Sequence, residues 1–279
     1  MERLEAAMAK ARAERSAVAV ASRAQKTTPN ATPGSAAQMQ PGLGDWSSLP
    51  SVDILPRQAR RKRIGALLGP EFSTHYDILR SRVLRQMKEA NWTRLAVTSP
   101  STQCGKSTVI LNLALSLARH GDLKIILMDF DLRHPSLASL LELKTCPDIV
   151  GLLRPGARFA DYAVRFGRNL AICPNHTKVR NSAELLQGRS TEEALDRIEA
   201  EWTPDLILFD TPPMQGNDDN LGFFARVDCA LIIAAAGAST LAQIDRCEQE
   251  VGNLTNILGT VLNKCRYSDN NTGFDETYY

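Results

Sequence analysis

Residues able to bind phosphate lie together around position 105. Gly105, Lys106 and Ser107 sit in the run Ser99–Thr108, which follows one apolar segment and opens another. In a phosphate-binding loop, backbone N–H groups surround the phosphates, a lysine reaches the outer phosphates, and a hydroxyl holds Mg²⁺. The usual first glycine of such a loop would fall at position 100, where this sequence has Pro100. The triplet therefore indicates a nucleotide site mainly through its place between a strand-like and a helix-like segment.

Two acidic motifs follow apolar segments further along the chain. They are D-x-D-x-R, with Asp129, Asp131 and Arg133, and D-T-P-P, which begins at Asp210. Ligands collect at the carboxyl ends of strands in an open parallel sheet, so we expect these side chains to meet Lys106 at one edge. Carboxylates there can hold Mg²⁺ directly or through water. Each motif alone is also compatible with an aspartate that caps a loop, but the three in this order favour a nucleotide site.

A sheet whose strands alternate with helices would position these residues. Six segments are strand-like, at residues 94–98, 123–128, 170–173, 206–209, 229–234 and 257–262. Helix-like segments lie at residues 72–87, 106–119, 136–143, 191–202 and 241–253. Strands that are apolar throughout indicate a parallel sheet buried on both faces. We therefore predict an α/β fold with a doubly wound, mostly parallel sheet and helices on both faces.

The motif order resembles that of the bacterial tyrosine kinases (BY-kinases) of capsular and exopolysaccharide biosynthesis. These are deviant-Walker P-loop ATPases related to the MinD/ParA group. Their Walker A loop lacks the first glycine, their Walker A′ motif ends in D-x-D-x-R, and their Walker B motif ends in D-T-P-P. Residues 181–186 are similar to the family's N-P-x-E-L-L segment, and residues 261–263 to a late strand whose asparagine reads the adenine. The resemblance spans about residues 70–265, and Ser101 stands about where MinD/ParA relatives carry a signature lysine.

The resemblance implies a role for each motif residue. Lys106 would neutralise the β- and γ-phosphates of ATP, and Ser107 would bind Mg²⁺ together with Asp210 and a Walker A′ aspartate. One Walker A′ aspartate, Asp129 or Asp131, would accept the proton of a tyrosine hydroxyl, whose ordinary pKa is near ~10. Arg133 would stabilise charge or hold its loop. The implied catalytic set is Lys106, Asp129, Asp131, Arg133 and Asp210, and the implied metal set is Ser107, Asp129 and Asp210. The implied ATP-binding set is Ser101, Thr102, Gln103, Cys104, Gly105, Lys106, Ser107, Thr108 and Asn263.

The expected phosphate acceptors are Tyr267, Tyr278 and Tyr279, three of the five tyrosines in the chain. Members of the family phosphorylate a C-terminal tyrosine cluster in trans, between the subunits of a ring. Residues 266–279 are polar, which is typical of a flexible tail that could reach another active site. An inert frayed tail is the alternative interpretation.

The helix near residue 76 bears on assembly. The ring-forming helix of the family commonly reads E-x-x-R-x-x-R. In the comparable stretch, residues 71–82, Arg80 matches one arginine, but Asp77 stands where another is expected. We expect a homo-oligomer, and the acidic residue leaves open whether this helix forms a ring.

Charge is divided unevenly along the chain. Residues 1–63 carry eleven Lys and Arg against five Asp and Glu, whereas the remainder carries 22 against 26. We predict an N-terminal helix and flexible basic linker arm (1–63), a P-loop tyrosine-kinase domain (64–265) and a flexible tail (266–279). Five positive charges at residues 57–63 either form a solvated surface or contact anionic lipid headgroups. The acidic body argues against nucleic acid as a partner.

The sequence offers no secretory signal and no apolar run long enough to span a bilayer. Its six scattered cysteines favour reduced thiols over disulfides or a cysteine metal site. The resemblance then implies a cytoplasmic protein, held at the inner face of the bacterial plasma membrane through a membrane-embedded polysaccharide co-polymerase. The N-terminal arm would dock on that partner.

Three functions fit these observations. The first is an ATP-dependent tyrosine autokinase that regulates exopolysaccharide or capsule polymerisation and export. The second is a MinD/ParA-type ATPase switch without kinase activity, which the missing signature lysine and the terminal tyrosines count against. The third is a catalytically silent nucleotide-binding regulator of the co-polymerase, which the intact lysine and aspartates oppose.

Overall fold

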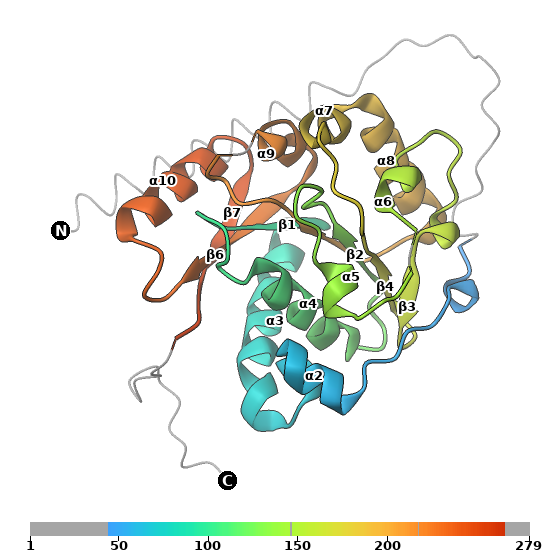
Figure 1. Cartoon of the computed structure of the whole chain (residues 1–279), viewed down its shortest axis with the longest axis horizontal. Helices are drawn as coiled ribbons and strands as arrows, with labels where there is room; N and C mark the ends of the chain where they lie inside the picture. Colours follow the sequence, from blue (N-terminus) through green and yellow to red (C-terminus); the bar gives the residue numbers. More distant parts are fainter. Residues whose placement is uncertain (1–43, 146, 217, 266–279) are drawn as a thin grey trace. The chain divides into compact units, whose positions relative to one another are not determined.

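A seven-stranded sheet forms the centre of the described part of the chain (Figure 1). The computed structural model describes residues 44–145, 147–216 and 218–265. The strands are β1 (Arg94–Thr98), β2 (Ile125–Asp129), β3 (Val164–Phe166), β4 (Leu170–Cys173), β5 (Leu206–Asp210), β6 (Cys229–Ala235) and β7 (Asn256–Asn263). Their order is β3-β4-β2-β5-β1-β6-β7, and all pairs are parallel except β3 with β4. The predicted α/β fold with a mostly parallel sheet is confirmed.

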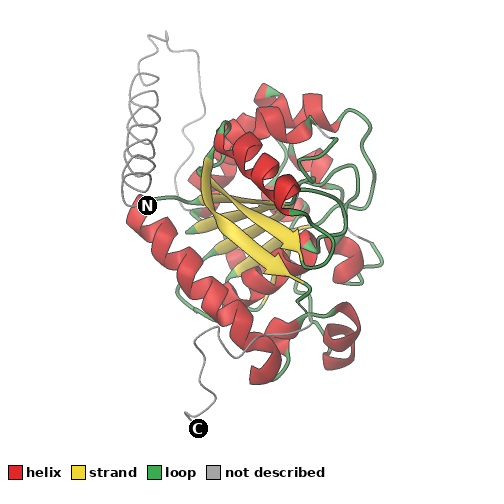
Figure 2. Cartoon of the chain, turned by 90° about the vertical axis from the view of Figure 1, so that its left-hand side faces the viewer, coloured by secondary structure: helices red, strands yellow, loops and turns green. Residues whose placement is uncertain are grey.

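Helices cover both faces of this sheet (Figure 2). On one face lie α2 (Pro56–Lys62), α3 (Pro70–Ala90), α4 (Lys106–Ala118) and α5 (Leu137–Leu140). On the other lie α6 (Ile149–Leu152), α7 (Ser182–Gln187), α8 (Arg189–Trp202), α9 (Asp219–Phe223) and α10 (Leu241–Gly252). Short 3-10 turns occupy Trp46–Ser48, Gly65–Leu67, Phe159–Asp161 and Phe224–Arg226.

Alternate residues of each strand enter two separate hydrophobic cores. In β2, Ile125 and Leu127 pack on the side of α3 and α4, whereas Ile126 and Met128 pack on the side of α8. Every residue of β2, β5 and β6 is buried, as strands covered on both faces require. Packing on both faces holds these strands in place. It therefore also holds the side chains at their carboxyl ends, among them Asp129 of β2 and Asp210 of β5.

Residues 44–63 differ from the flexible arm that the sequence suggested. Trp46 is buried and its ring meets that of Trp202 edge-on, with the ring centroids 6.0 Å apart. In α2, Ala59 is fully buried, and the Gln58 amide donates a hydrogen bond to the carbonyl of Leu141 at 2.8 Å. The sequence did not indicate that α2 is packed against the domain because its buried residues, Gln58 and Ala59, are polar or small and give no hydrophobic pattern. The rest of the expected arm, the first helix included, lies outside the described residues.

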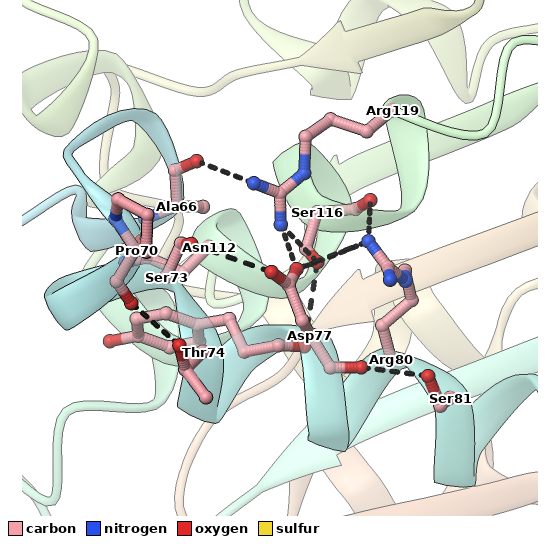
Figure 3. Close-up of polar contacts among 11 residues, drawn as sticks. Ala66, Pro70, Ser73, Thr74, Asp77, Arg80, Ser81, Asn112, Ser116 and Arg119 are labelled. Atoms are coloured by element: carbon pink, nitrogen blue, oxygen red, sulfur yellow. Dashed lines mark hydrogen bonds and ion pairs between the residues drawn. The ribbon is translucent and has the colours of Figure 1, made fainter. Parts of the chain in front are cut away.

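Asp77 links α3 to α4 (Figure 3). Its carboxylate accepts a hydrogen bond from the hydroxyl of Ser116 at 2.6 Å and pairs with the guanidinium groups of Arg80 and Arg119. Arg119 also donates a hydrogen bond to the carbonyl of Ala66. The acidic residue that departs from the family's ring-forming pattern is thus engaged within its own chain, where it fixes α3 against the end of the phosphate-loop helix.

No helix among the described residues is long and apolar enough to cross a membrane. The expected acceptors Tyr267, Tyr278 and Tyr279 lie outside the described residues, so their role stays a prediction.

Candidate active site

The loop between β1 and α4 has the backbone that a phosphate-binding loop needs. Gln103 and Gly105 adopt left-handed φ angles of 60° and 89°. A Cβ atom at position 105 would be strained by that φ and would collide with the side-chain amide of Asn263. Directly after this turn α4 begins, 13 residues long, so the free N–H groups of its first turn and its helix dipole face the loop. Gln103 and Gly105 thus supply the turn that leads into α4, in a loop where Pro100 takes the place of the usual first glycine.

The end of β7 supports this loop. The Asn263 side-chain amide donates to the carbonyl of Cys104 at 2.9 Å, and the Lys264 ammonium donates to the carbonyl of Gln103 at 2.7 Å. Asn263 was expected to read the adenine, and that contact stays a prediction. Its observed bond nevertheless brings the last strand of the sheet to the phosphate loop.

Lys106 lies among the three predicted aspartates. Its ammonium donates to Asp131 Oδ2 at 3.0 Å, and both side chains are buried. Burial lowers the pKa of Lys106, but the nearby carboxylates of Asp210, Asp131 and Asp129 outweigh it and raise that pKa above its ordinary value. The lysine therefore stays charged in a site with an excess of acidic groups.

Asp129 and Asp210 are both completely buried at the ends of adjacent strands β2 and β5. Burial is the main cause that raises the pKa of Asp210 to about 6, against the lowering effect of the Lys106 ammonium and the Ser107 hydroxyl. Burial, together with the Asp210 charge, also raises the pKa of Asp129 well above its usual range. Two neighbouring carboxylates in an apolar environment resist simultaneous ionisation unless a cation joins them.

Three buried carboxylate oxygens at this edge lack a well-formed hydrogen bond in the described part of the chain. Asp129 Oδ2 accepts the backbone N–H groups of Ser136 and Leu137, but its Oδ1 accepts none, and neither oxygen of Asp210 has a partner at hydrogen-bond geometry, although the Ser107 hydroxyl is near enough to lower the Asp210 pKa. Such orphaned oxygens suit a hydrated Mg²⁺, which prefers oxygen ligands and keeps several waters. No group of three or more His, Cys, Asp and Glu side chains in the described residues could hold a metal ion by itself. The donors thus fit a Mg²⁺ that is shared with phosphate oxygens and the Ser107 hydroxyl.

Arg133 turns away from the aspartates of its own motif toward α9. Its guanidinium pairs with Asp219 at 2.6 Å and with Asp218 at 2.9 Å, and the Asp219 carboxylate is fully buried. The sequence left open whether this arginine stabilises charge or holds its loop, and the contacts favour the second role. The acidic pair after D-T-P-P was missed, although two aspartates eight and nine residues beyond Asp210 were a visible signal.

Hydroxyl groups surround the thiol of Cys104. Its Sγ lies 3.7 Å from the Oγ atoms of both Ser101 and Ser239. Burial raises the pKa of this thiol, but the hydrogen bonds with Ser101 and Ser239 outweigh it, so the pKa lies below its ordinary value. Sequence reasoning missed Ser239, which follows β6 and comes to the loop through tertiary structure alone. Thr102 and Gln103 are exposed, whereas Ser107 and Thr108 are half-buried in the first turn of α4.

The hydroxyls of two threonines join β1 to the D-T-P-P segment. Thr98 donates to the carbonyl of Pro212 at 2.7 Å, and Thr211 donates to that of Val97 at 3.0 Å. These bonds fix the strand end that carries Asp210 beside the phosphate loop. The structure thus brings together Lys106, the three aspartates and the loop, as predicted from the motif order.

Comparison with known proteins gives one family match for most of this region. The family described as ParA, NUBPL iron-transfer P-loop NTPase, matches residues 92–278. That stretch contains the phosphate loop and both aspartate motifs.

Curated relatives are identical to this chain at about a quarter of the aligned positions. EpsB of Ralstonia solanacearum is 26% identical over 85% of this chain, which spans 33% of that longer protein. The tyrosine-protein kinase CpsD of Streptococcus pneumoniae serotype 4 is 27% identical over 64% of this chain and is itself covered over 79% of its length. Among solved structures, the kinase domain of the Escherichia coli tyrosine kinase ETK matches with a TM-score of 0.66 and 22% identity, covering 86% of this chain and 100% of that domain. This likeness shows a shared fold.

Proposed function

Because this chain belongs to the ParA family of P-loop NTPases, we propose that its phosphate loop binds Mg·ATP and transfers the γ-phosphoryl group to protein tyrosines. The relatives named as tyrosine-protein kinases support the choice of tyrosine as acceptor. The observation that carries the proposal is the buried cluster of Lys106 with Asp129, Asp131 and Asp210 at the start of α4.

Each residue of the cluster has a distinct task in this reaction. ATP would donate its γ-phosphoryl group and leave as ADP, and the accompanying Mg²⁺ would supply the positive charge that the orphaned carboxylate oxygens of Asp129 and Asp210 lack. Lys106, which contacts Asp131 in the free protein, would bind the outer phosphates instead, and Ser107 and Asp210 would hold the Mg²⁺ ion. A Walker A′ carboxylate, Asp129 or Asp131, takes the proton of the tyrosine hydroxyl. Arg133 holds the Walker A′ loop to α9 and acts as a positioning residue.

The proposed acceptors are Tyr267, Tyr278 and Tyr279. Both tyrosines in the described residues, Tyr76 and Tyr162, are half-buried within the domain. Burial raises the pKa of Tyr76 above its ordinary value, which further disfavours it as an acceptor. We place the acceptors in the tail and the transfer between copies of the chain in a homo-oligomer.

The setting is proposed by analogy with the relatives. The chain would regulate capsule or exopolysaccharide polymerisation and export at the inner face of the bacterial plasma membrane. A membrane-embedded co-polymerase would recruit and activate it through the N-terminal arm.

A second candidate function is an ATPase switch without protein phosphorylation. The match to the ParA family favours it. The two functions share the nucleotide site and differ in the fate of the phosphoryl group, so a single assay separates them.

The test follows phosphate in purified full-length protein incubated with Mg·ATP, using Lys106→Met as the control. Mass spectrometry should locate phosphate on the tail tyrosines of the wild type, and Lys106→Met should carry none. Release of inorganic phosphate without labelled protein would contradict the kinase proposal and support the ATPase switch. Nucleotide binding without either product would leave a catalytically silent regulator.

A further inference from the structure

Helix α2 has an exposed face that carries positive charge. Its inward side consists of Gln58 and Ala59, which are buried, whereas Arg57, Arg60 and Arg63 are exposed. The side chains of these three arginines make no hydrogen bond or ion pair in the described part of the chain. Arg57 and Arg60 are three residues apart and so lie on the same side of the helix, and Arg63 follows at its C-cap. These three unpaired guanidinium groups concentrate positive charge within seven residues of chain.

The acidic residue that α2 contacts is already neutralised. Glu142 pairs with Arg61 and lies 3.9 Å from Lys62, and these contacts lower the pKa of Glu142. The first cause of that lowering is the hydrogen bond from Arg61. The Arg57 charge contributes to that lowering without forming an ion pair, so the guanidinium donors of Arg57, Arg60 and Arg63 remain available to an external anionic partner.

A large exposed apolar side chain precedes these arginines in the chain. Leu55, the residue before the helix, has 61% of its surface exposed. We propose that the α2 face, defined as Leu55, Arg57, Arg60 and Arg63, binds the surface of an anionic lipid bilayer. The arginines would contact headgroup phosphates, and the leucine would enter the boundary between headgroups and acyl chains.

The chemistry of the face favours a bilayer over nucleic acid. A helix of seven residues is about 10 Å long, which is short for following a nucleic-acid backbone. The face lacks an aromatic side chain on which a base could stack. An apolar residue beside unpaired arginines is instead the composition of an interfacial membrane contact.

The face is rigidly joined to the phosphate-loop helix. The Asn112 amide of α4 donates to the carbonyls of Arg63 and Thr108, and its Oδ1 accepts the N–H of Ala66. A bilayer bound by α2 would therefore hold α4, and the nucleotide site at its start, in a fixed orientation to the membrane. This contact is direct and independent of any protein partner or of the proposed kinase activity.

The experiment is co-sedimentation of the full-length protein with vesicles of phosphatidylcholine alone or with 30% phosphatidylglycerol. Each arginine near an anionic surface contributes about a fivefold gain in partition, so R57Q/R60Q/R63Q should weaken binding to the mixed vesicles by on the order of 100-fold. The matched control R82Q/R154Q/R168Q removes the same charge from exposed positions elsewhere and should retain wild-type binding. Leu55→Ala should weaken binding a few-fold, and added salt should release the wild type.

Unchanged binding of R57Q/R60Q/R63Q would overturn the proposal, as would equal binding to vesicles without phosphatidylglycerol. Binding to a short DNA duplex in preference to mixed vesicles would overturn it in favour of nucleic acid. Circular dichroism and thermal unfolding of each variant establish that its fold is retained, which the exposure of all substituted side chains predicts.

Discussion

At the scale of single residues, one lysine shares a buried space with three carboxylates. Lys106 can neutralise one of Asp129, Asp131 and Asp210, which leaves the site with an acidic excess. Burial is the first cause of the raised pKa values of Asp129 and Asp210, and the neighbouring carboxylates add to it. A bound cation removes the excess, so the same burial that destabilises the free site prepares it for Mg·ATP.

Asp210 should make the free energy of unfolding depend on pH. Its pKa rises from 3.8 to about 6 on folding, so the folded state holds the proton more tightly and stability falls as the pH rises through that range. Replacing Asp210 by Asn should remove this fall. The free energy of unfolding of D210N minus that of the wild type should be about 2–3 kcal/mol larger at pH 7 than at pH 4. Urea denaturation without nucleotide measures this difference. Asp245→Asn, on the exposed side of α10, controls for the lost charge, and a D210N difference that is equal at both pH values contradicts the account.

Arg133 should act through Asp219 rather than on the nucleotide directly. Arg133→Ala leaves the buried Asp219 carboxylate unpaired and should cost about 1–3 kcal/mol of stability, a range that allows for the partly exposed arginine. Adding Asp219→Asn should recover part of that loss because the unpaired charge is gone. Thermal unfolding of both variants measures the difference, and a double variant that loses the sum of the two effects would show that the pair is not coupled.

At the scale of elements, strands were easier to predict than connections. β1 and β4 have the predicted bounds because apolar runs buried on both faces depend little on context. β3 was missed because it is a three-residue, half-buried edge strand. α2 was missed because its burial depends on Leu141 and α4, which are distant in sequence. The motif order predicted the meeting of the aspartates, whereas the Arg133–Asp219 pair required the tertiary structure.

Asp77 should stabilise the packing of α3 on α4. Asp77→Ala leaves Arg119, Arg80 and Ser116 without their shared acceptor and should cost about 1–2 kcal/mol. Glu89→Ala on the same helix is the matched control, since its pair with Arg85 is well exposed and should contribute less than about 0.5 kcal/mol. Urea denaturation midpoints compare the two, and equal effects would contradict a structural role for Asp77.

Asp77→Arg, the residue that the family pattern would place there, tests the same link more severely. It puts a third guanidinium beside Arg80 and Arg119, so it should destabilise the protein more than Asp77→Ala does. A stable Asp77→Arg variant would mean that this helix tolerates the ring-forming sequence without its intrachain ion pairs.

At the scale of the whole molecule, the packing of residues 44–63 determines which N-terminal truncations should keep the stability of the domain. Removal of residues 1–43 should leave nucleotide binding intact. Removal of residues 1–63 takes away the buried Trp46, Leu49 and Ala59 and should lower the melting temperature by several degrees. Thermal unfolding with and without Mg·ATP distinguishes the two truncations, and equal stability would contradict the packing seen here.

The central claim is that this nucleotide site phosphorylates the tail tyrosines of another copy of the chain. The direct measurement mixes Lys106→Met, which retains the tyrosines, with Tyr267→Phe/Tyr278→Phe/Tyr279→Phe, which retains the site. In Mg·ATP, mass spectrometry should find phosphate on the tail of Lys106→Met in the mixture and on neither variant alone. A Lys106→Met tail that stays unphosphorylated in the mixture, while wild-type protein is labelled, would contradict transfer between chains, and an unlabelled wild type would contradict the kinase itself.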